Sequence, residues 1–365
     1  MVGSYNPMEQ RQTQTSMQSV LSDLGYRQEM FKMTLDDSGP QGQLVYVQKF
    51  PVTLKSNQSL SRRVYFTNYF GWLGEIREHG IHPVMNEITV LAETGKWGIS
   101  TNSVRTQILG ELRGNDIVEV RFWLERASGK SNGTFDGMFE WRRVLSGGKY
   151  ERVAISKLRT TWIQITGHGE ARIASLPEAT GRFMNKMLPR DLVSRPLENL
   201  PESLSGVRLG KKMFLSKKKA KFLLHTEIFQ TTLEDSNLIG NIYFANYSKW
   251  LGRTADMFFY RLMPDAFKGT GQHGEFLCLN CEIEHLREAM PFDKVVVKMY
   301  PETVYECGLD LYFEYFRLNE DSSETKLAYA RFKIVWAKRE GEFNLSAIAL
   351  PSTVLKEIER RIQCL

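Results

Sequence analysis

The chain contains one sequence pattern twice, and this repetition limits its possible folds more than any other feature. Residues 64–74 read VYFTNYFGWLG and residues 242–252 read IYFANYSKWLG, with seven of eleven positions identical. Four further blocks keep the same order, and the offset between the copies drifts only from 178 to 174 residues. The blocks are 111–116 with 288–293, 135–141 with 309–315, 154–162 with 328–336, and 174–178 with 348–352. Chance similarity is a poor explanation for five collinear blocks, so we interpret the chain as two copies of one unit.

Each copy has the same predicted order of elements. A strand-like segment comes first, a tyrosine-rich helix follows, and several strands complete the unit. Apolar side chains in the second helix recur at steps of three and four, which marks one buried face. They are Phe244, Tyr247, Leu251, Thr254 and Phe258. The predicted strands are 44–54, 117–124, 133–144 and 153–165, then 222–233, 294–300, 308–318 and 327–338. One helix among antiparallel strands predicts an α+β fold.

Two polar segments lie outside the repeated units, which we place at residues 42–188 and 221–365. Residues 1–41 are rich in Gln, Ser and Met and lack periodicity, so we expect a flexible segment. Residues 189–220 contain three prolines and a lysine-rich run. Such a composition favours a solvated linker over a binding element.

The composition and the missing motifs exclude several function classes. No run approaches the roughly 20 apolar residues of a membrane span, and the N-terminus lacks the apolar core of a signal peptide. We therefore expect a cytoplasmic protein. The net charge of +6 is compatible with an acidic partner, but no nucleic-acid motif accompanies it. The sequence contains no Gly-x-Ser-x-Gly elbow, P-loop or dinucleotide fingerprint, and we expect no cofactor.

The four cysteines predict neither a disulfide scaffold nor a metal site. Cys278 and Cys281 have the spacing of metal ligands, but no second pair accompanies them and zinc needs four ligands. Cys281 aligns with Val104 in the other copy, which favours a packed strand position.

A resemblance to a known family enters at residues 235–253, which read DSNLIGNIYFANYSKWLGR. This segment resembles the helix entry of the 4-hydroxybenzoyl-CoA thioesterase superfamily. It is most similar to the thioesterases of enediyne polyketide pathways, whose pattern is close to DTNxxGNVYFxNYxxWxGR. The resemblance implies a tandem double hot-dog fold, in which a curved antiparallel sheet wraps a long helix in each unit. The two units would pair as an internal pseudo-dimer with active sites at their interface, and further oligomerisation stays open.

The resemblance also implies an activity and a set of residues. The activity is hydrolysis of an acyl or polyketide chain from an acyl carrier protein or coenzyme A, alongside a polyketide synthase. The implied catalytic residues are Asn237, Gly240, Asn241, Tyr243 and Arg253. Gly240 can take backbone angles that other residues avoid, and its turn leads to a helix N-terminus, whose dipole favours a developing oxyanion.

The side chains of this set have separate expected roles. Arg253 is assigned to oxyanion or substrate electrostatics. Asn237 would orient water or the carbonyl, because an amide cannot act as a carboxylate nucleophile. Asp235 is either a substitute base or, more commonly for such a residue, a cap of the turn. The family often has a second basic residue two positions beyond the motif arginine, where this chain has Ala255.

The first copy departs from the pattern at its loop and helix. Ser59 replaces Asn237, Arg62 and Arg63 replace Gly240 and Asn241, and Glu75 replaces Arg253. We expect this copy to be mainly a degenerate partner that completes the interface. Glu75 is a possible second site, because some hot-dog thioesterases carry their carboxylate on the central helix. Arg62 and Arg63 are also candidate contacts for a carrier protein, since carrier proteins are typically acidic.

Other functions stay open at this point. The hot-dog fold also hosts acyltransferases and dehydratases that act on carrier-bound chains. A non-catalytic acyl-binding scaffold would be consistent with the missing carboxylate. The retained asparagines, glycine and arginine favour an enzyme.

Overall fold

The computed structural model describes most of the chain. The described residues are 33–40, 42–128, 133–167, 170–188, 207–215, 222–268, 273–341 and 344–363. Most of the predicted flexible segment and of the predicted linker therefore lies outside the described residues. The parts that are described contain two short strands, noted below.

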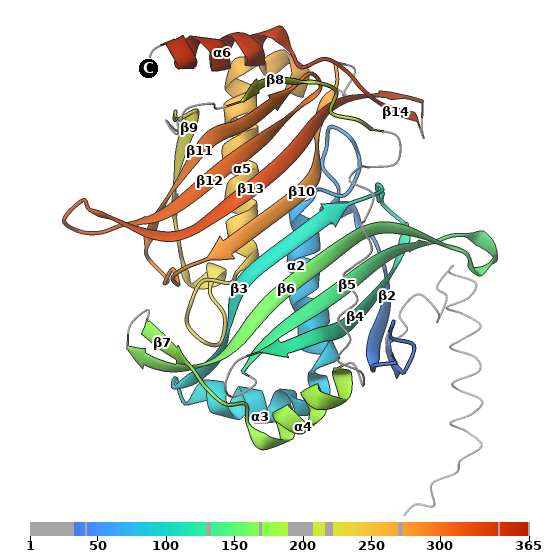
Figure 1. Ribbon diagram of the computed structural model, residues 1–365, viewed down its shortest axis with the longest axis vertical. Helices are drawn as coiled ribbons and strands as arrows, with labels where there is room; N and C mark the ends of the chain where they lie inside the picture. Colours follow the sequence, from blue (N-terminus) through green and yellow to red (C-terminus); the bar gives the residue numbers. More distant parts are fainter. Residues whose placement is uncertain are drawn as a thin grey trace, which may run out of the picture.

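One antiparallel sheet of 14 strands runs through both units (Figure 1). Its main path has the order β1-β2-β4-β5-β6-β3-β10-β13-β12-β11-β8, while β7, β14 and β9 pair with β6, β13 and β11. The first unit contains β1 (Met33–Asp36), β2 (Val45–Pro51), β3 (Trp97–Ile108), β4 (Ile117–Ser128), β5 (Thr134–Val144), β6 (Tyr150–Gly167) and β7 (Glu170–Ile173). The second contains β8 (Lys212–Leu215), β9 (His225–Gln230), β10 (Glu275–His285), β11 (Lys294–Tyr305), β12 (Gly308–Leu318), β13 (Glu324–Glu340) and β14 (Asn344–Ala347).

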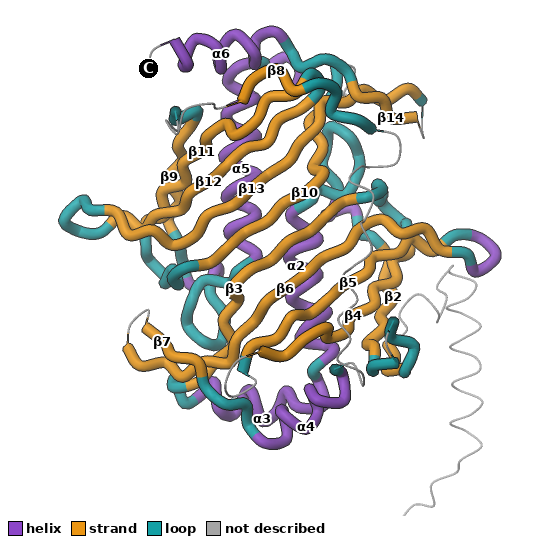
Figure 2. The backbone as a smooth tube through the Cα atoms, viewed as in Figure 1, coloured by secondary structure: helices purple, strands orange, loops and turns teal. Residues whose placement is uncertain are grey.

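The two units join at β3 and β10, which lie at the middle of the continuous sheet (Figure 2). Their antiparallel register places Arg105 opposite Glu282, and Val104 opposite Ile283. Arg105 and Glu282 are 177 residues apart, the same separation as Val104 and Cys281 in the sequence repeat. Because equivalent residues pair with each other, a pseudo-two-fold axis passes between these strands, as in an isologous dimer interface.

Two helices lie side by side on one face of the sheet, α2 (Thr67–Gly80) and α5 (Ala245–Leu262). The apolar stripe expected along the second helix is buried at all five of its positions, with Phe244 lying just before α5 begins. The other α-helices of the described residues are α3 (His82–Glu93), α4 (Glu178–Met187) and α6 (Ser352–Gln363). One continuous hydrophobic core spans both units, so the chain folds as a single body rather than as two separate domains.

The structure differs from the sequence expectation at the edges of the units. Residues 33–36 form β1, inside the segment expected to be flexible, and residues 212–215 form β8, inside the expected linker. Each is short and pairs with a longer strand, β2 or β11, so the pairing comes from the neighbouring sheet rather than from a local pattern. Among helices in the described residues, none is long and apolar enough to cross a membrane.

The structure places both cysteines of the Cys278–Cys281 pair at packed strand positions. Cys278 and Cys281 are free and buried in β10, and no cluster of potential metal ligands occurs among the described residues.

Candidate functional site

Two related cavities lie at the interface between the units, each combining a loop of one unit with the helix of the other. We call them cavity A and cavity B. Cavity A combines the second unit's motif loop with α2 of the first unit. Its lining is Arg77, Ile99, Thr101, Asn237, Asn241, Ile242, Tyr243, Phe244, His285 and Glu288. Cavity B combines the first unit's loop, including Gln58, Arg63 and Tyr65, with Ala255 and Asp256 of α5.

Backbone hydrogen bonds fix the motif loop of cavity A. The N–H of Asn237 donates to the carbonyl of Asn241 at 3.1 Å, and the N–H of Gly240 donates to the carbonyl of Asn237 at 2.9 Å. Gly240 has φ +90°, with open space where a Cβ would stand, as the sequence predicted for this turn. The N–H of Ile242 donates to the carbonyl of Ala289 at 2.9 Å, so the loop is held beside the turn that carries Glu288.

The helix of the other unit supports this loop through a close contact. A Cβ on Gly74 would stand 1.7 Å from the hydroxyl oxygen of Tyr243, so only glycine fits at this point of α2. In the equivalent contact, a Cβ on Gly252 of α5 would stand 2.8 Å from the hydroxyl oxygen of Tyr65. Burial raises the pKa of Tyr243 to about 12, so its hydroxyl stays protonated at neutral pH, and it forms a hydrogen bond with the side chain of Glu78.

Glu288 is the carboxylate in cavity A. The hydroxyl of Ser100 donates to it at 2.5 Å, and Asn241 also hydrogen bonds to it. Burial raises its pKa despite these two hydrogen bonds. Its counterpart Glu111 is instead held by Arg339 at 2.6 and 2.8 Å. Because Glu288 forms no such ion pair among the described residues, it has the character of an acid–base group rather than of a structural charge.

Several buried polar atoms of cavity A lack a hydrogen-bond partner among the described residues. They are Nε2 of His285, Oδ1 of Asn241 and Nε of Arg77. Desolvation lowers the pKa of His285 to about 4, so its imidazole is neutral at physiological pH. Unpaired buried polar atoms are rare in proteins, and their convergence on one cavity is typical of a ligand site.

Arg77 supplies the positive charge of cavity A. Its side chain is 12% exposed, forms an ion pair with Glu78 at 3.1 Å, and lies over the ring of Phe244 with 5.6 Å between the guanidinium carbon and the ring centroid. By the 178-residue offset, Arg77 is the counterpart of Ala255. The second basic residue of the family pattern, absent from the second copy, is therefore present in the first copy and faces the second copy's loop.

Sequence reasoning singled out three residues that do line cavity A: Asn237, Asn241 and Tyr243. The backbone N–H of Ile239 donates to the side-chain oxygen of Asn237 at 2.9 Å, which leaves the amide NH₂ for a ligand. Arg253 does not line this cavity and lies on the exposed side of α5. Glu75 is exposed in a hollow beside its own unit's β2, lined by Phe50, Thr53 and Trp72 among others.

Asp235 caps its turn, which is the more common of the two roles expected for it from the sequence. Its carboxylate accepts hydrogen bonds from the backbone N–H of Thr232 at 2.9 Å and from the Thr232 hydroxyl at 3.2 Å, while Thr232 caps the 3₁₀ turn Leu233–Asp235. Both acceptor contacts fix the turn and none points to a base.

The first unit's loop keeps the shape of the motif loop with one additional residue. The N–H of Gln58 donates to the carbonyl of Arg63, so Gln58, rather than Ser59, occupies the place of Asn237. Arg62 has φ 58° at the counterpart of Gly240, so the left-handed turn persists without its glycine. Arg62 is exposed, but Arg63 turns inward and lines cavity B.

Sequence reasoning missed Arg77 and Glu288. Arg77 was detectable, because Gly74-Glu-Ile-Arg-Glu78 aligns with the helix half of the family pattern, and pairing of the units brings that half to the other copy's loop. Glu288 lay within an aligned block opposite Glu111, but nothing in the sequence separated its environment from that of Glu111.

Solved structures named as thioesterases match most of this chain in fold. The 12:0-ACP thioesterase from Umbellularia californica is 12% identical, covers 80% of this chain and 94% of its own, and superimposes with a TM-score of 0.56. The chain has a tandem double hot-dog fold. A structure named as an oleoyl thioesterase from Lactobacillus plantarum is 12% identical, covers 82% of this chain and 98% of its own, with a TM-score of 0.55.

Shorter proteins match one unit of the double hot-dog. The dynemicin thioesterase is 24% identical, covers 38% of this chain and 96% of its own, with a TM-score of 0.35. No family model and no curated protein matches the sequence. The predicted tandem hot-dog fold is confirmed.

Proposed function

We propose that this double hot-dog protein hydrolyses acyl thioesters at cavity A. The observation that carries the proposal is the convergence of Asn237, Arg77 and Glu288 from three separate segments on one polar cavity. Each supplies a different requirement of acyl transfer: a hydrogen-bond donor, a positive charge and a group that accepts a proton.

In the proposed reaction, water is the nucleophile and Glu288 the general base. Glu288 takes one proton from water as the oxygen bonds to the thioester carbonyl carbon. The negative charge on the carbonyl oxygen is stabilised by Arg77 and the amide NH₂ of Asn237, beside the N-terminus of α5. The carbon–sulfur bond then breaks, and the proton on Glu288 passes to the departing thiolate. The products are a carboxylic acid and a free thiol.

An apolar cavity in the first unit is the proposed site of the acyl chain. It shares Arg77 and Ile99 with cavity A, and its empty space is about 530 Å³, part of which is open to solvent. Most of its walls are hydrocarbon side chains from the sheet, α3 and α4. They include Ile81, Ile88, Phe122, Leu124, Phe135, Leu158, Trp162, Leu176 and Met184. A chain held there would place its carbonyl group near Arg77, and its burial would provide binding energy.

An acyl carrier protein is the carrier that we favour, since the structural neighbour from Umbellularia californica is a 12:0-ACP thioesterase. The basic chain and the exposed Arg62 suit an acidic carrier, whereas Arg63 is engaged in an internal ion pair. Charge attraction would raise the encounter rate and make it sensitive to salt. The check is kcat/KM for one acyl group on a carrier protein and on coenzyme A, at low and high salt. Equal efficiency without salt dependence would remove the carrier protein from the proposal.

The test of the reaction is the release of free thiol from dodecanoyl-coenzyme A and dodecanoyl carrier protein. Glu288→Gln keeps the size of the side chain but removes the base, and should lower kcat by about 10²-fold or more. The matched control is Glu75→Gln, an exposed glutamate outside cavity A, which should leave the rate unchanged. If the two variants behave alike, cavity A is not the reaction site.

A further inference from the structure

Cavity B is larger and less polar than cavity A. Its empty space is about 660 Å³, part of which is open to solvent, and lies between the first unit's loop, α5, β10 and β13. Six aromatic side chains contribute to its walls, namely Tyr65, Phe66, Tyr69, Phe259, Phe276 and Phe332. Tyr65, which leads into α2, stands where Tyr243 stands in cavity A.

The helix side of cavity B differs from cavity A at two adjacent positions. Ala255 replaces Arg77, and Asp256 replaces Glu78. In cavity A the guanidinium of Arg77 pairs with Glu78, so that carboxylate is neutralised. In cavity B no such partner exists among the described residues of α5, and the small Ala255 side chain leaves space beside Asp256.

Asp256 is held by one hydrogen bond and is otherwise open to the cavity. The hydroxyl of Tyr65 donates to its Oδ2 at 2.8 Å. The Asp256 side chain is exposed to solvent, yet enough protein surrounds its carboxyl group that desolvation raises its pKa to about 6. Tyr65 acts against this shift, because its hydrogen bond favours the ionised form. A carboxylate with such a pKa is largely ionised at neutral pH and is still a useful base.

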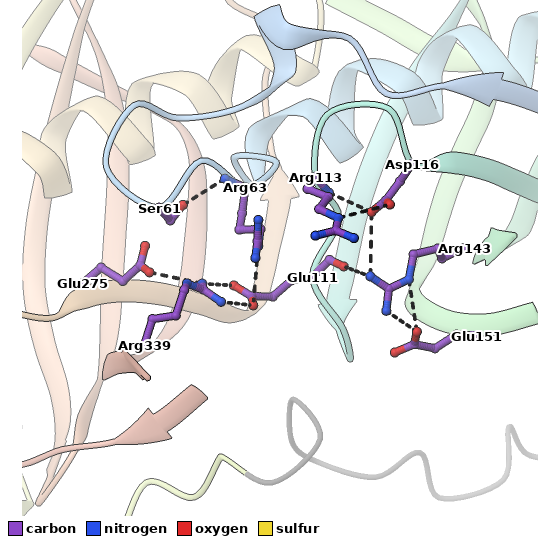
Figure 3. Close-up of polar contacts among 9 residues, drawn as sticks. All are labelled: Ser61, Arg63, Glu111, Arg113, Asp116, Arg143, Glu151, Glu275 and Arg339. Atoms are coloured by element: carbon purple, nitrogen blue, oxygen red, sulfur yellow. Dashed lines mark hydrogen bonds and ion pairs between the residues drawn. The ribbon is translucent and has the colours of Figure 1, made fainter. Parts of the chain in front are cut away.

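The other charged groups around cavity B are paired with one another. Arg63 and Glu111 line the cavity and lie 3.9 Å apart. Figure 3 shows Arg339 between Glu111 and Glu275, with nitrogen–oxygen distances of 2.6 and 3.2 Å. This network ties β13 of the second unit to the first unit's loop and provides a cation, Arg63, at the counterpart of Asn241.

Cys278 also lines cavity B but does not suit a nucleophile. Burial raises the pKa of its thiol well above the usual range, so the thiolate is scarce at neutral pH. The group able to activate water is therefore Asp256.

We propose that cavity B is a second, separate site of acyl-thioester hydrolysis, in which Asp256 is the general base and Tyr65 positions it. Asp256 takes a proton from water as the water oxygen bonds to the carbonyl carbon. Arg63 faces the carbonyl oxygen, the carbon–sulfur bond breaks, and the proton returns to the thiolate. The apolar walls select an apolar acyl group. The carboxylate of this second site is Asp256 on α5, rather than Glu75 on α2.

The experiment measures thiol release from hexanoyl- and dodecanoyl-coenzyme A by the full chain carrying Glu288→Gln, which removes the base of cavity A. The remaining hydrolysis of at least one thioester should fall by about 10²-fold when Asp256→Asn is added. If Glu288→Gln abolishes hydrolysis, or if Asp256→Asn leaves the remainder unchanged, the second site is refuted. If Asp256→Asn alone removes all activity and Glu288→Gln removes none, cavity B stands and the function proposed for cavity A fails.

Tyr65→Phe separates positioning from packing. Without the hydroxyl, the pKa of Asp256 should rise. The pH at which the remaining hydrolysis rate reaches half of its maximum should then be higher. A role in packing alone would lower the rate at every pH without moving the profile. Unfolding temperatures of all variants show whether each chain is folded.

Discussion

Replacement of Arg77 by alanine is the sharpest test of how the two units combine. The guanidinium lies in a cavity with little exposure, and its Nε has no described partner. A unit charge about 5 Å from a developing oxyanion, at an effective dielectric constant of about 20, contributes about 3 kcal/mol. Since about 1.4 kcal/mol corresponds to a factor of ten, Arg77→Ala should lower kcat by about 10²-fold.

The matched control is Arg253→Ala, which removes the arginine that the family pattern marks in the second copy. Its side chain is exposed and outside cavity A, so this variant should retain nearly full turnover. The assay is thiol release from dodecanoyl-coenzyme A, with kcat and KM measured separately. If Arg253→Ala loses activity and Arg77→Ala keeps it, the role given to Arg77 of the first copy is refuted. The catalytic arginine would then be Arg253, in the same copy as the motif loop.

Three further predictions follow from the interface and its buried groups. Gly74→Ala should destabilise the fold by about 1–3 kcal/mol and reduce turnover, because the new Cβ overlaps the Tyr243 hydroxyl. Gly252→Ala should have a smaller effect, because its Cβ would stand farther from the Tyr65 hydroxyl. Thermal unfolding and kcat/KM measure both variants. Glu288→Gln should raise the unfolding temperature near pH 8 and not near pH 4. The pKa of Glu288 is higher in the folded chain than in the unfolded chain, so its ionisation at high pH favours unfolding. Glutamine does not ionise and removes this destabilisation. Residues 207–365 expressed alone should dimerise or aggregate in size-exclusion chromatography, since β10 loses its partner β3; a soluble, fully active monomer would contradict this.

The repeat and its periodicity predicted two copies of an α+β unit, and the family resemblance supplied the hot-dog arrangement of those copies. Some strands were predicted with nearly correct bounds. The predicted strand 308–318, for example, matches β12. The helical face around Leu251 was correct because an amphipathic period reflects burial directly. β3 and β10 were not predicted as the central pair, because their neighbour across the sheet belongs to the other copy and leaves no local signal.

The site was less accessible to sequence reasoning than the fold. The loop residues Asn237, Asn241 and Tyr243 are close together in the sequence, so a motif contains them. Arg77 and Asp256 lie opposite a loop about 160 to 200 residues away in the sequence, and a motif read within one copy misses them. The raised pKa of Asp256 depends on desolvation, which is a property of the folded surroundings and not of the residue type.

The crossing of loops and helices between the units has a consequence for how such a chain diversifies. In a dimer of identical chains, every substitution appears in both sites at once, so neither site changes without the other. Fusion into one polypeptide removes that constraint. The first copy has arginine at position 77, and the second copy has alanine at the equivalent position 255. The two cavities therefore differ in charge at this point. Loss of a residue from one copy thereby reshapes the pocket facing the other copy's loop, and leaves the pocket on its own loop intact.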